Sequence, residues 1–207
     1  HNMAMTTRLE RDAIGNFPVP AGAYYGIFTS RAIKNFQLTG QKVPRVYIQA
    51  IGLIKEACIE VNLDLGQLDK TIAKAMLSAA RELAEGKFDE EFPIDVISAG
   101  AGTPFNMNAN EIIANRANEI LGKPLGTYNP VHPNNHVNMS QSSNDVTPTA
   151  IRVASLLLIG KLVPSLEKLI GGIKDIAIKY SRLVKVGRTH LEDAVPITLG
   201  QEFRAFA

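Results

Sequence analysis

The 207-residue sequence predicts a mostly α-helical protein. Apolar side chains recur at helical spacing in several segments, and one such pattern continues from about Pro148 to Tyr180. There is little alternating strand pattern, no internal repeat and no low-complexity tract. At about 1.5 Å per residue the longest helix would span roughly 50 Å, more than the roughly 30 Å diameter of a small domain. We therefore expect it to need helical partners of similar length, from further sequence or from other subunits.

The first part of the chain is expected to pass from irregular backbone into two helices. Residues 8–43 are predicted to be irregular because "FPVPAGAYYG" contains two prolines and two glycines. Pro44 suits the first turn of a helix. The apolar positions of that helix are Ile51, Ile54, Cys58 and Val61. Asp69 is expected to cap the next helix, which Gly86 ends.

Three helical segments are expected in the remainder of the chain. "ANEIIANRANEILG" predicts a helix that ends at Gly122. In the long pattern Thr147 is the expected cap and Pro148 the expected first residue. "LGQEFRAFA" predicts a last helical segment over residues 199–207.

Composition excludes several classes of protein. The chain is 45% hydrophobic and 20% charged with a net charge of +2, and no basic run is interleaved with aromatic residues, so nucleic acid is not an expected partner. Cys58 is the only cysteine, which excludes an internal disulfide and favours a cytoplasmic location. No apolar stretch is expected to span a membrane, and no signal peptide is visible. His1–Met3 resembles a cloning remnant and is excluded from the fold.

Polar loops precede three of the expected helices. The loop before the third helix is "SAGAGTPFNMN", which contains a glycine-rich turn. The loop before the long helix is "QSSND", and the loop before the last helix is "VKVGRTHLEDAVPITLG". Because the first turn of a helix presents unpaired N–H groups and a partial positive charge, such loops are suited to bind anions. The candidate ligand-binding residues are Thr103, Ser142, Ser143, Asn144, Thr189 and His190. Convergence on one small polyanionic ligand is the functional interpretation.

Each loop also has a purely structural interpretation. Serine, threonine and asparagine before a helix usually act as caps. Arg188 would then satisfy carbonyl groups, and the asparagines from Asn106 to Asn110 would hold their loop in shape. His132 and His136 have the spacing of a metal pair, but no cysteine or carboxylate joins them at ligand spacing, so no metal site is expected.

Three of these segments together resemble the aspartase/fumarase superfamily. "GAGTPFNMNANEIIANRA", "HPNNHVNMSQSSNDVTPTA" and "GRTHLEDAVPITLGQEF" are similar to its first two conserved regions, in the same order and at the same separations. The resemblance extends from about Arg8 to Ala207 and corresponds to the first part of a family member. Because the motifs are long, the match is highly specific.

The resemblance implies a particular fold and reaction. A small N-terminal helical domain would comprise residues 1–145, and residues 146–207 would begin a central bundle of long helices. Members form homotetramers, and their active site is built from three regions on three subunits. They eliminate ammonia, water or a larger amine from a succinyl-type skeleton and release fumarate. A small dicarboxylate substrate is therefore expected, without a cofactor, a metal or a membrane.

The resemblance also assigns roles to the candidate residues. Those that would hold the carboxylates of the substrate are Thr103, Ser142, Ser143, Asn144 and Thr189. His190 would orient one carboxylate or assist proton transfer at the leaving group. Donors so placed would stabilise the enediolate-like dianion that proton removal creates. His132, Asn134 and Asn135 of the "HPNN" loop resemble a secondary anion site of fumarases, which more often end this motif with aspartate.

The family's third region is a flexible loop with the general-base serine and a carboxylate-binding lysine. Nothing in these residues resembles it, so the 207-residue chain alone is expected to be inactive and to self-associate through its long helix. "AYYG", "AGAGT" and "LGQEFRAFA" resemble aspartases, whereas "HPN" and "SSND" resemble fumarases. Aspartate ammonia-lyase is the expected activity, with class II fumarate hydratase and a non-catalytic structural relative as alternatives.

Overall fold

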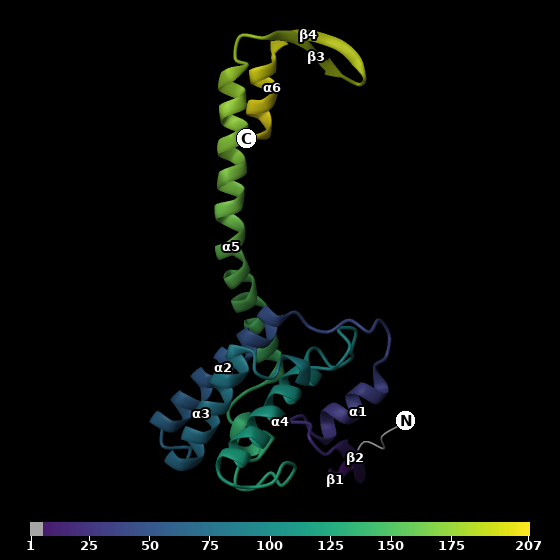
Figure 1. Cartoon of the computed structure of the whole chain (residues 1–207), viewed down its shortest axis with the longest axis vertical. Coiled ribbons are helices and arrows are strands. Elements are labelled where there is room, and N and C mark those ends of the chain that lie inside the picture. Colours follow the sequence, from purple (N-terminus) through teal and green to yellow (C-terminus); the bar gives the residue numbers. More distant parts are fainter. Residues whose placement is uncertain (1–5) are drawn as a thin grey trace. The chain divides into compact units, whose positions relative to one another are not determined.

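The computed structural model describes residues 6–207, which fold into two compact units (Figure 1). The first unit reaches to Ser155 and the second comprises Leu156–Ala207. Most of the described residues are helical, which confirms the predicted class. The His1–Met3 segment lies outside the described residues. Helix α5, Ser143–Lys179, contributes to both units, so the predicted domain boundary at residues 145 and 146 stays a prediction.

The chain begins with a hairpin where irregular backbone was expected. Strands β1, Thr7–Arg11, and β2, Asn16–Pro20, pair antiparallel, and helix α1, Ile27–Asn35, follows. The Asp12 carboxylate accepts hydrogen bonds from two backbone N–H groups of the turn, which lets the strands reverse. Proline has no N–H group to donate to a neighbouring strand. In a two-stranded sheet each strand has one unpaired edge, so β2 can contain prolines. The expectation of irregular backbone over residues 8–43 is therefore wrong for this part.

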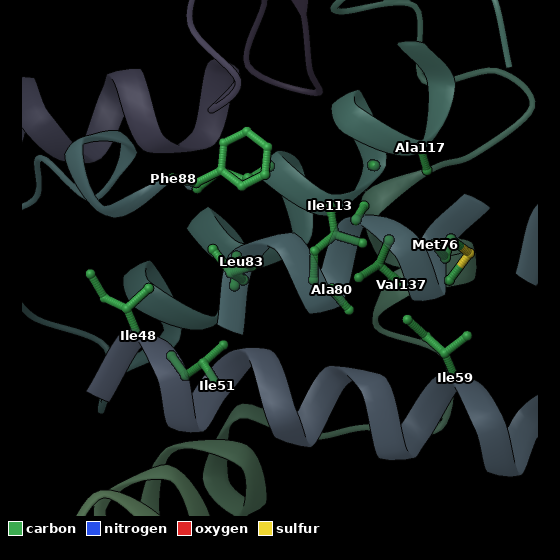
Figure 2. Close-up of a cluster of buried hydrophobic side chains, with 14 of the residues drawn as sticks. Ile48, Ile51, Ile59, Met76, Ala80, Leu83, Phe88, Ile113, Ala117 and Val137 are labelled. Atoms are coloured by element: carbon green, nitrogen blue, oxygen red, sulfur yellow. The ribbon is translucent and has the colours of Figure 1, made fainter. Parts of the chain in front are cut away.

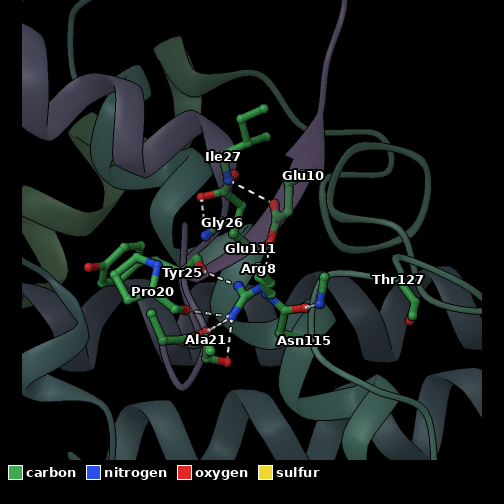
Figure 3. A network of polar contacts seen from close by, with 12 residues as sticks. Arg8, Glu10, Pro20, Ala21, Tyr25, Gly26, Ile27, Glu111, Asn115 and Thr127 are labelled. Carbon is green, nitrogen blue, oxygen red and sulfur yellow. Dashed lines mark hydrogen bonds and ion pairs between the residues drawn. The ribbon is translucent and has the colours of Figure 1, made fainter. Parts of the chain in front are cut away.

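Two buried carboxylates meet the N-terminus of α1 (Figure 3). Glu111 accepts hydrogen bonds from the N–H groups of Gly26, Phe28 and Thr29 at 2.9, 2.8 and 3.1 Å. Glu10 accepts a hydrogen bond from the remaining N–H group of this turn, that of Ile27, at 2.9 Å. All four donors at the start of this helix are therefore satisfied by side chains from distant segments.

Arg8 and Tyr128 complete this polar cluster. The Arg8 guanidinium pairs with Glu10 at 2.8 Å and also donates to four backbone carbonyl groups between Pro20 and Tyr25. The Tyr128 hydroxyl donates to Glu10 at 2.9 Å. One cation and one hydroxyl thus compensate part of the buried negative charge.

Helices α2, Arg45–Asp64, α3, Lys70–Glu85, and α4, Thr103–Ile120, pack around the main hydrophobic core (Figure 2). Buried members of this core include Ile48, Ile51 and Ile59 of α2, Met76, Ala80 and Leu83 of α3, and Ile113 and Ala117 of α4. The predicted limits hold for α3, whereas α4 begins at Thr103, within the segment that was expected to be a loop before Ala109. The Asp69 carboxylate caps α3 by accepting from two N–H groups, and Gly86 ends the helix at a φ of 95°.

Buried asparagines of α4 hold the surrounding loops. Asn108 donates to a carbonyl group of the short helix η1, Asp89–Glu91, at 3.0 Å. Asn118 both donates to and accepts from the backbone of Val131, shortly before the short helix η2, Pro133–Val137. Asn115 donates to the carbonyl group of Tyr24 and accepts from the N–H group of Gly126. The structural interpretation of the asparagines from Asn106 to Asn110 is therefore confirmed for Asn108, and Asn115 and Asn118 hold loops in the same way.

Helix α5 carries many exposed apolar side chains. Within residues 156–179, Leu162 and Leu169 are 54% and 59% exposed. By length and composition alone this helix could cross a membrane, so the expectation that no apolar stretch is long enough is wrong. A helix that packs against other helices passes the same test, and the evidence for a membrane is correspondingly weak.

The second unit contains another hairpin, where the sequence predicts a loop. Strands β3, Val184–Thr189, and β4, Glu192–Thr198, pair antiparallel, with a register shift between Val186 and Arg188. Helix α6, Leu199–Phe206, follows and confirms the last expected helix. A capping box between Thr198 and Gln201 fixes its start. Pro196 and the glycine of β3 concealed the strand pattern.

Candidate functional site

The first candidate loop runs directly into α4 along a left-handed backbone. Gly100, Ala101 and Gly102 have φ values of 101°, 49° and 87°. A Cβ atom at Gly102 would overlap the side chain of Thr147 in α5, so only glycine lets the loop lie this close to that helix. Thr103 is the first residue of α4, and no side chain caps this helix.

The second candidate loop ends earlier than predicted. Helix α5 begins at Ser143, so the expected cap at Thr147 is wrong. Ser142 takes that role, because its Oγ accepts from the N–H of Asn144 at 3.2 Å. Ser143 is half-buried and Asn144 is exposed in the first turn of α5. Ser142 Oγ accepts as a cap and keeps its hydroxyl hydrogen for a ligand, whereas within the described chain the side chains of Ser143 and Asn144 cap nothing. The role of Ser142 as a carboxylate-binding residue stays a prediction.

Asn106 joins the two helix starts. It lies one turn after Thr103, and its Nδ2 donates to Ser143 Oγ at 2.9 Å and to Asn138 Oδ1 at 3.1 Å. Together with the contact between Gly102 and Thr147, this brings the first two predicted loops into one site. Hydroxyl and amide donors from both helix starts are suited to bind a carboxylate.

A buried lysine, Lys55, which the sequence-based predictions do not include, lies at the centre of this link. The Lys55 side chain of α2 is fully buried, and its Nζ donates to three amide oxygens. The acceptors are Asn106 Oδ1 at 2.7 Å, Gln141 Oε1 at 2.7 Å and Asn138 Oδ1 at 3.3 Å. A signal was present, because Lys55 lies at helical spacing between Ile51 and Ile59 on the inward face of α2.

Thr189 and His190 belong to the second unit. Thr189 ends β3, and His190 and Leu191 form the turn to β4 with φ values of 52° and 64°. Both candidates are exposed. Arg188 donates to the carbonyl group of Leu191 at 2.7 Å, which confirms the structural interpretation of this arginine. The expected loop over residues 187–190 is wrong, since β3 continues to Thr189 and His190 lies in the tight turn of the hairpin. The role of Thr189 and His190 at a site stays a prediction.

His132 and its neighbours form a separate polar turn. His132 Nδ1 accepts from the N–H groups of Asn134 and Asn135 at 3.1 and 3.3 Å, and His136 Nδ1 accepts from the N–H of His132 at 2.9 Å. Burial lowers the pKa of both histidines. Each ring therefore has one nitrogen engaged with the backbone, and within residues 6–207 no third metal-binding group joins the pair.

A cavity of about 200 Å³ lies beside His132. Asn134 also lines this cavity, and Asn135 is not among its lining residues. The charged residues that line the cavity are one cation, Arg11, and two acidic residues, Asp12 and Glu111. The secondary anion site at His132, Asn134 and Asn135 stays a prediction.

Comparison with known proteins gives consistent matches over nearly the whole chain. A lyase family model matches residues 15–207. Class II fumarate hydratase from Thermus thermophilus is 50% identical over 98% of this chain and 44% of its own length. Aspartate ammonia-lyase from a Bacillus species is 44% identical over 99% of this chain and 44% of its own length. The chain thus spans less than half the length of these relatives.

Solved structures agree with this result. A fumarate lyase:delta crystallin structure from Brucella melitensis superposes with a TM-score of 0.92 at 45% identity, covering 97% of this chain and 44% of that one. Class II fumarase from Schistosoma mansoni gives a TM-score of 0.90 at 36% identity, covering 97% and 43%. Identity and fold together show that the chain belongs to the lyase family of class II fumarate hydratases and aspartate ammonia-lyases, the aspartase/fumarase superfamily.

Proposed function

We propose that the whole protein, meaning these 207 residues with any sequence that flanks them, interconverts L-malate and fumarate. The observation that carries this proposal is the joining of two helix starts by Asn106, with Thr103 and Ser143 beside the link. Several relatives named class II fumarate hydratase, at 46% to 50% identity, support water as the leaving group.

The chemistry requires donors of this kind. A base removes a proton from the carbon next to one carboxylate, whose oxygens take up the negative charge. The C–O bond then breaks, the double bond forms, and hydroxide leaves with a proton as water. Thr103, Ser143 and Asn144 would donate to the carboxylates as that charge develops. Thr189 and His190 would complete the set, and the general base would come from residues beyond this chain.

L-Aspartate is the second candidate substrate. The variants "AYYG", "AGAGT" and "LGQEFRAFA" favour it, as does the Bacillus relative at 44% identity. Elimination of ammonia uses the same carboxylate donors and differs at the leaving group. A non-catalytic structural role is the third candidate. The side chains of Thr103 and Asn144 cap no helix in the described part of the chain, and this argues against such a role.

Turnover of the two substrates decides between these proposals. The whole protein should form fumarate from L-malate, measured by ultraviolet absorbance, and should leave L-aspartate unchanged under the same conditions. A protein heated to inactivation supplies the baseline. Turnover of L-aspartate alone would transfer the assignment to aspartate ammonia-lyase, and turnover of neither would contradict both.

We further propose a cytoplasmic homo-oligomer, a tetramer for the whole protein, in which α5 packs against equivalent helices. The exposed leucines of α5 supply an apolar face of the kind that soluble proteins rarely leave uncovered. The family resemblance supports the tetramer, and the single free thiol of Cys58 supports the location.

Self-association through α5 should be visible in the 207-residue chain itself. Light scattering at roughly micromolar concentration is expected to give a mass above that of a monomer. Replacing both Leu162 and Leu169 with glutamate should lower it, because two exposed apolar contacts are lost. Lys168→Glu changes the net charge by the same amount without removing apolar surface and should leave the mass unchanged. A wild-type monomer would contradict the prediction.

A further inference from the structure

Lys55 is a buried cation whose hydrogen-bond partners among residues 6–207 include no carboxylate. Its side chain is fully buried, and its three hydrogen bonds all go to neutral amide oxygens. The three acceptors come from α4 and from the segment that leads into α5, so one side chain of α2 holds both helix starts. Burial lowers the pKa of this ammonium group to about 7, and the charge of Cys58 opposes that shift.

An ammonium group has three donors and no acceptor. Asn106 must therefore present its oxygen to Lys55, which it does at 2.7 Å. The Nδ2 of the same amide then faces the opposite way and donates to Ser143 Oγ at 2.9 Å. The reverse orientation would place an N–H₂ group against the ammonium and an oxygen against Ser143. The same Nδ2 also donates to Asn138 Oδ1 at 3.1 Å, and Lys55 in turn donates to that oxygen at 3.3 Å. Lys55, together with Asn138, thus fixes which end of the Asn106 amide meets the serine.

The orientation of Asn106 determines what Ser143 can do. Because Ser143 Oγ accepts a hydrogen bond from Asn106, its own hydroxyl hydrogen remains available to donate elsewhere. If Asn106 presented an oxygen instead, the Ser143 hydroxyl would donate to it and would offer only a lone pair to an anion. An anionic ligand needs the donor.

We propose that Lys55 is a positioning residue that acts through the Asn106 amide to direct the Ser143 hydroxyl hydrogen toward the dicarboxylate. This rests on the proposed function, because Ser143 is taken to contact the substrate. Core packing alone does not require a lysine at this position. An apolar side chain of similar length would fill the same space without the cost of burying an ammonium group.

A double-mutant cycle tests the path from Lys55 to Ser143. Lys55→Met in the whole protein should lower kcat/KM for the substrate by about tenfold or more, because Ser143 no longer has a fixed donor direction. In a Ser143→Ala background the same substitution should change kcat/KM by less than about twofold. A purely structural role would lower the stability of the protein and leave the two effects additive.

Asn106→Asp tests the proposal without removing the lysine. The new carboxylate can still accept from Lys55, as an ion pair, while it offers Ser143 an acceptor in place of a donor. The melting temperature should therefore stay near that of the wild type, whereas kcat/KM should fall by about tenfold or more. That fall should disappear in the Ser143→Ala background. This variant keeps the test valid even if Lys55→Met does not fold.

Asn62→Ala is the matched control on the same helix. Asn62 is buried in α2 and donates to the carbonyl group of Met139 at 3.2 Å, but it does not contact Asn106 or Ser143. It should lower stability with kcat/KM unchanged. Activity that is unaffected by Asn106→Asp, or additive effects in the cycle, would overturn the role of Lys55 in an active enzyme. A wild-type protein that neither converts nor binds L-malate, L-aspartate or fumarate would overturn the proposed function and the role of Lys55 with it.

Discussion

Alanine at Asn144 or at Thr103 should lower kcat/KM of the whole protein by about 10²-fold or more, the range for losing a transition-state donor. The Asn144 side chain is exposed in the first turn of α5, and Thr103 begins a helix that no side chain caps. Neither side chain serves as a cap in the described structure, so their loss should cost little stability. Steady-state kinetics with L-malate and a thermal melt of each variant measure the two effects separately.

Thr71→Ala is the matched control for Thr103→Ala. Thr71 also lies in the first turn of a helix, α3, and is exposed. It should leave kcat/KM unchanged. Thr189→Ala is expected to behave like Thr103→Ala, and loss of His190 should slow turnover to a smaller degree. Normal kinetics with lowered stability in the Thr103 and Asn144 variants would show that these residues serve only the fold.

The helices of the first unit could be predicted because their signals are local. Asp69 and Gly86 lie within a few residues of the backbone groups that they satisfy, so their positions mark the ends of α3. The start of α5 was harder to predict. Pro148 resembles a first helical residue, but Ser142 offers an earlier cap, and the helix continues through the proline.

The two hairpins depend on contacts that local patterns do not show. β1 is short and carries Arg8 and Glu10, whose partners come from β2 and from the residues around α1. β4 contains a proline, and β3 contains a glycine where the register shifts. Strands so short and interrupted do not give a clear alternation of apolar and polar residues.

The sequence indicates which side chains of the candidate site could bind an anion. It does not indicate which buried residue holds their segments together. The sequence predicts Ser143 and Thr103 because donors before a helix suit anions, and the structure joins their segments. It does not predict Lys55, because a lysine at a helical position is usually solvent-exposed. Only the fold places it against Asn106, 51 positions along the chain. Long-range polar contacts of this kind are specified by packing, which periodicity cannot reveal.

Glu111→Ala should be among the most destabilising single substitutions in the first unit. It would leave the N–H groups of Gly26, Phe28 and Thr29 without their acceptor in a buried setting. Since each unpaired buried donor costs about 1–3 kcal/mol, the free energy of unfolding should fall by about 3 kcal/mol or more. Urea unfolding of the 207-residue chain, followed by circular dichroism, measures this loss.

The effect should depend on pH. Burial raises the pKa of the Glu111 carboxyl from 4.5 to about 7, against the opposing effect of the N–H groups. Between these values the folded chain binds this proton more tightly than the unfolded chain does, so the carboxyl's contribution to stability falls as pH rises through that window. The difference in unfolding free energy between wild type and Glu111→Ala should therefore be larger at about pH 5 than at about pH 8.

Glu85→Ala provides the comparison that isolates burial. Glu85 ends α3, where its carboxylate is exposed and contacts only the exposed ammonium group of Lys87 at 3.4 Å. Surface pairs of this kind contribute about 0–1 kcal/mol, so this variant should unfold almost as the wild type does at both pH values. If the loss in Glu111→Ala instead grew as the pH rose, the carboxylate would be ionised throughout. The hydrogen bonds from the start of α1 would then outweigh the cost of burying its charge.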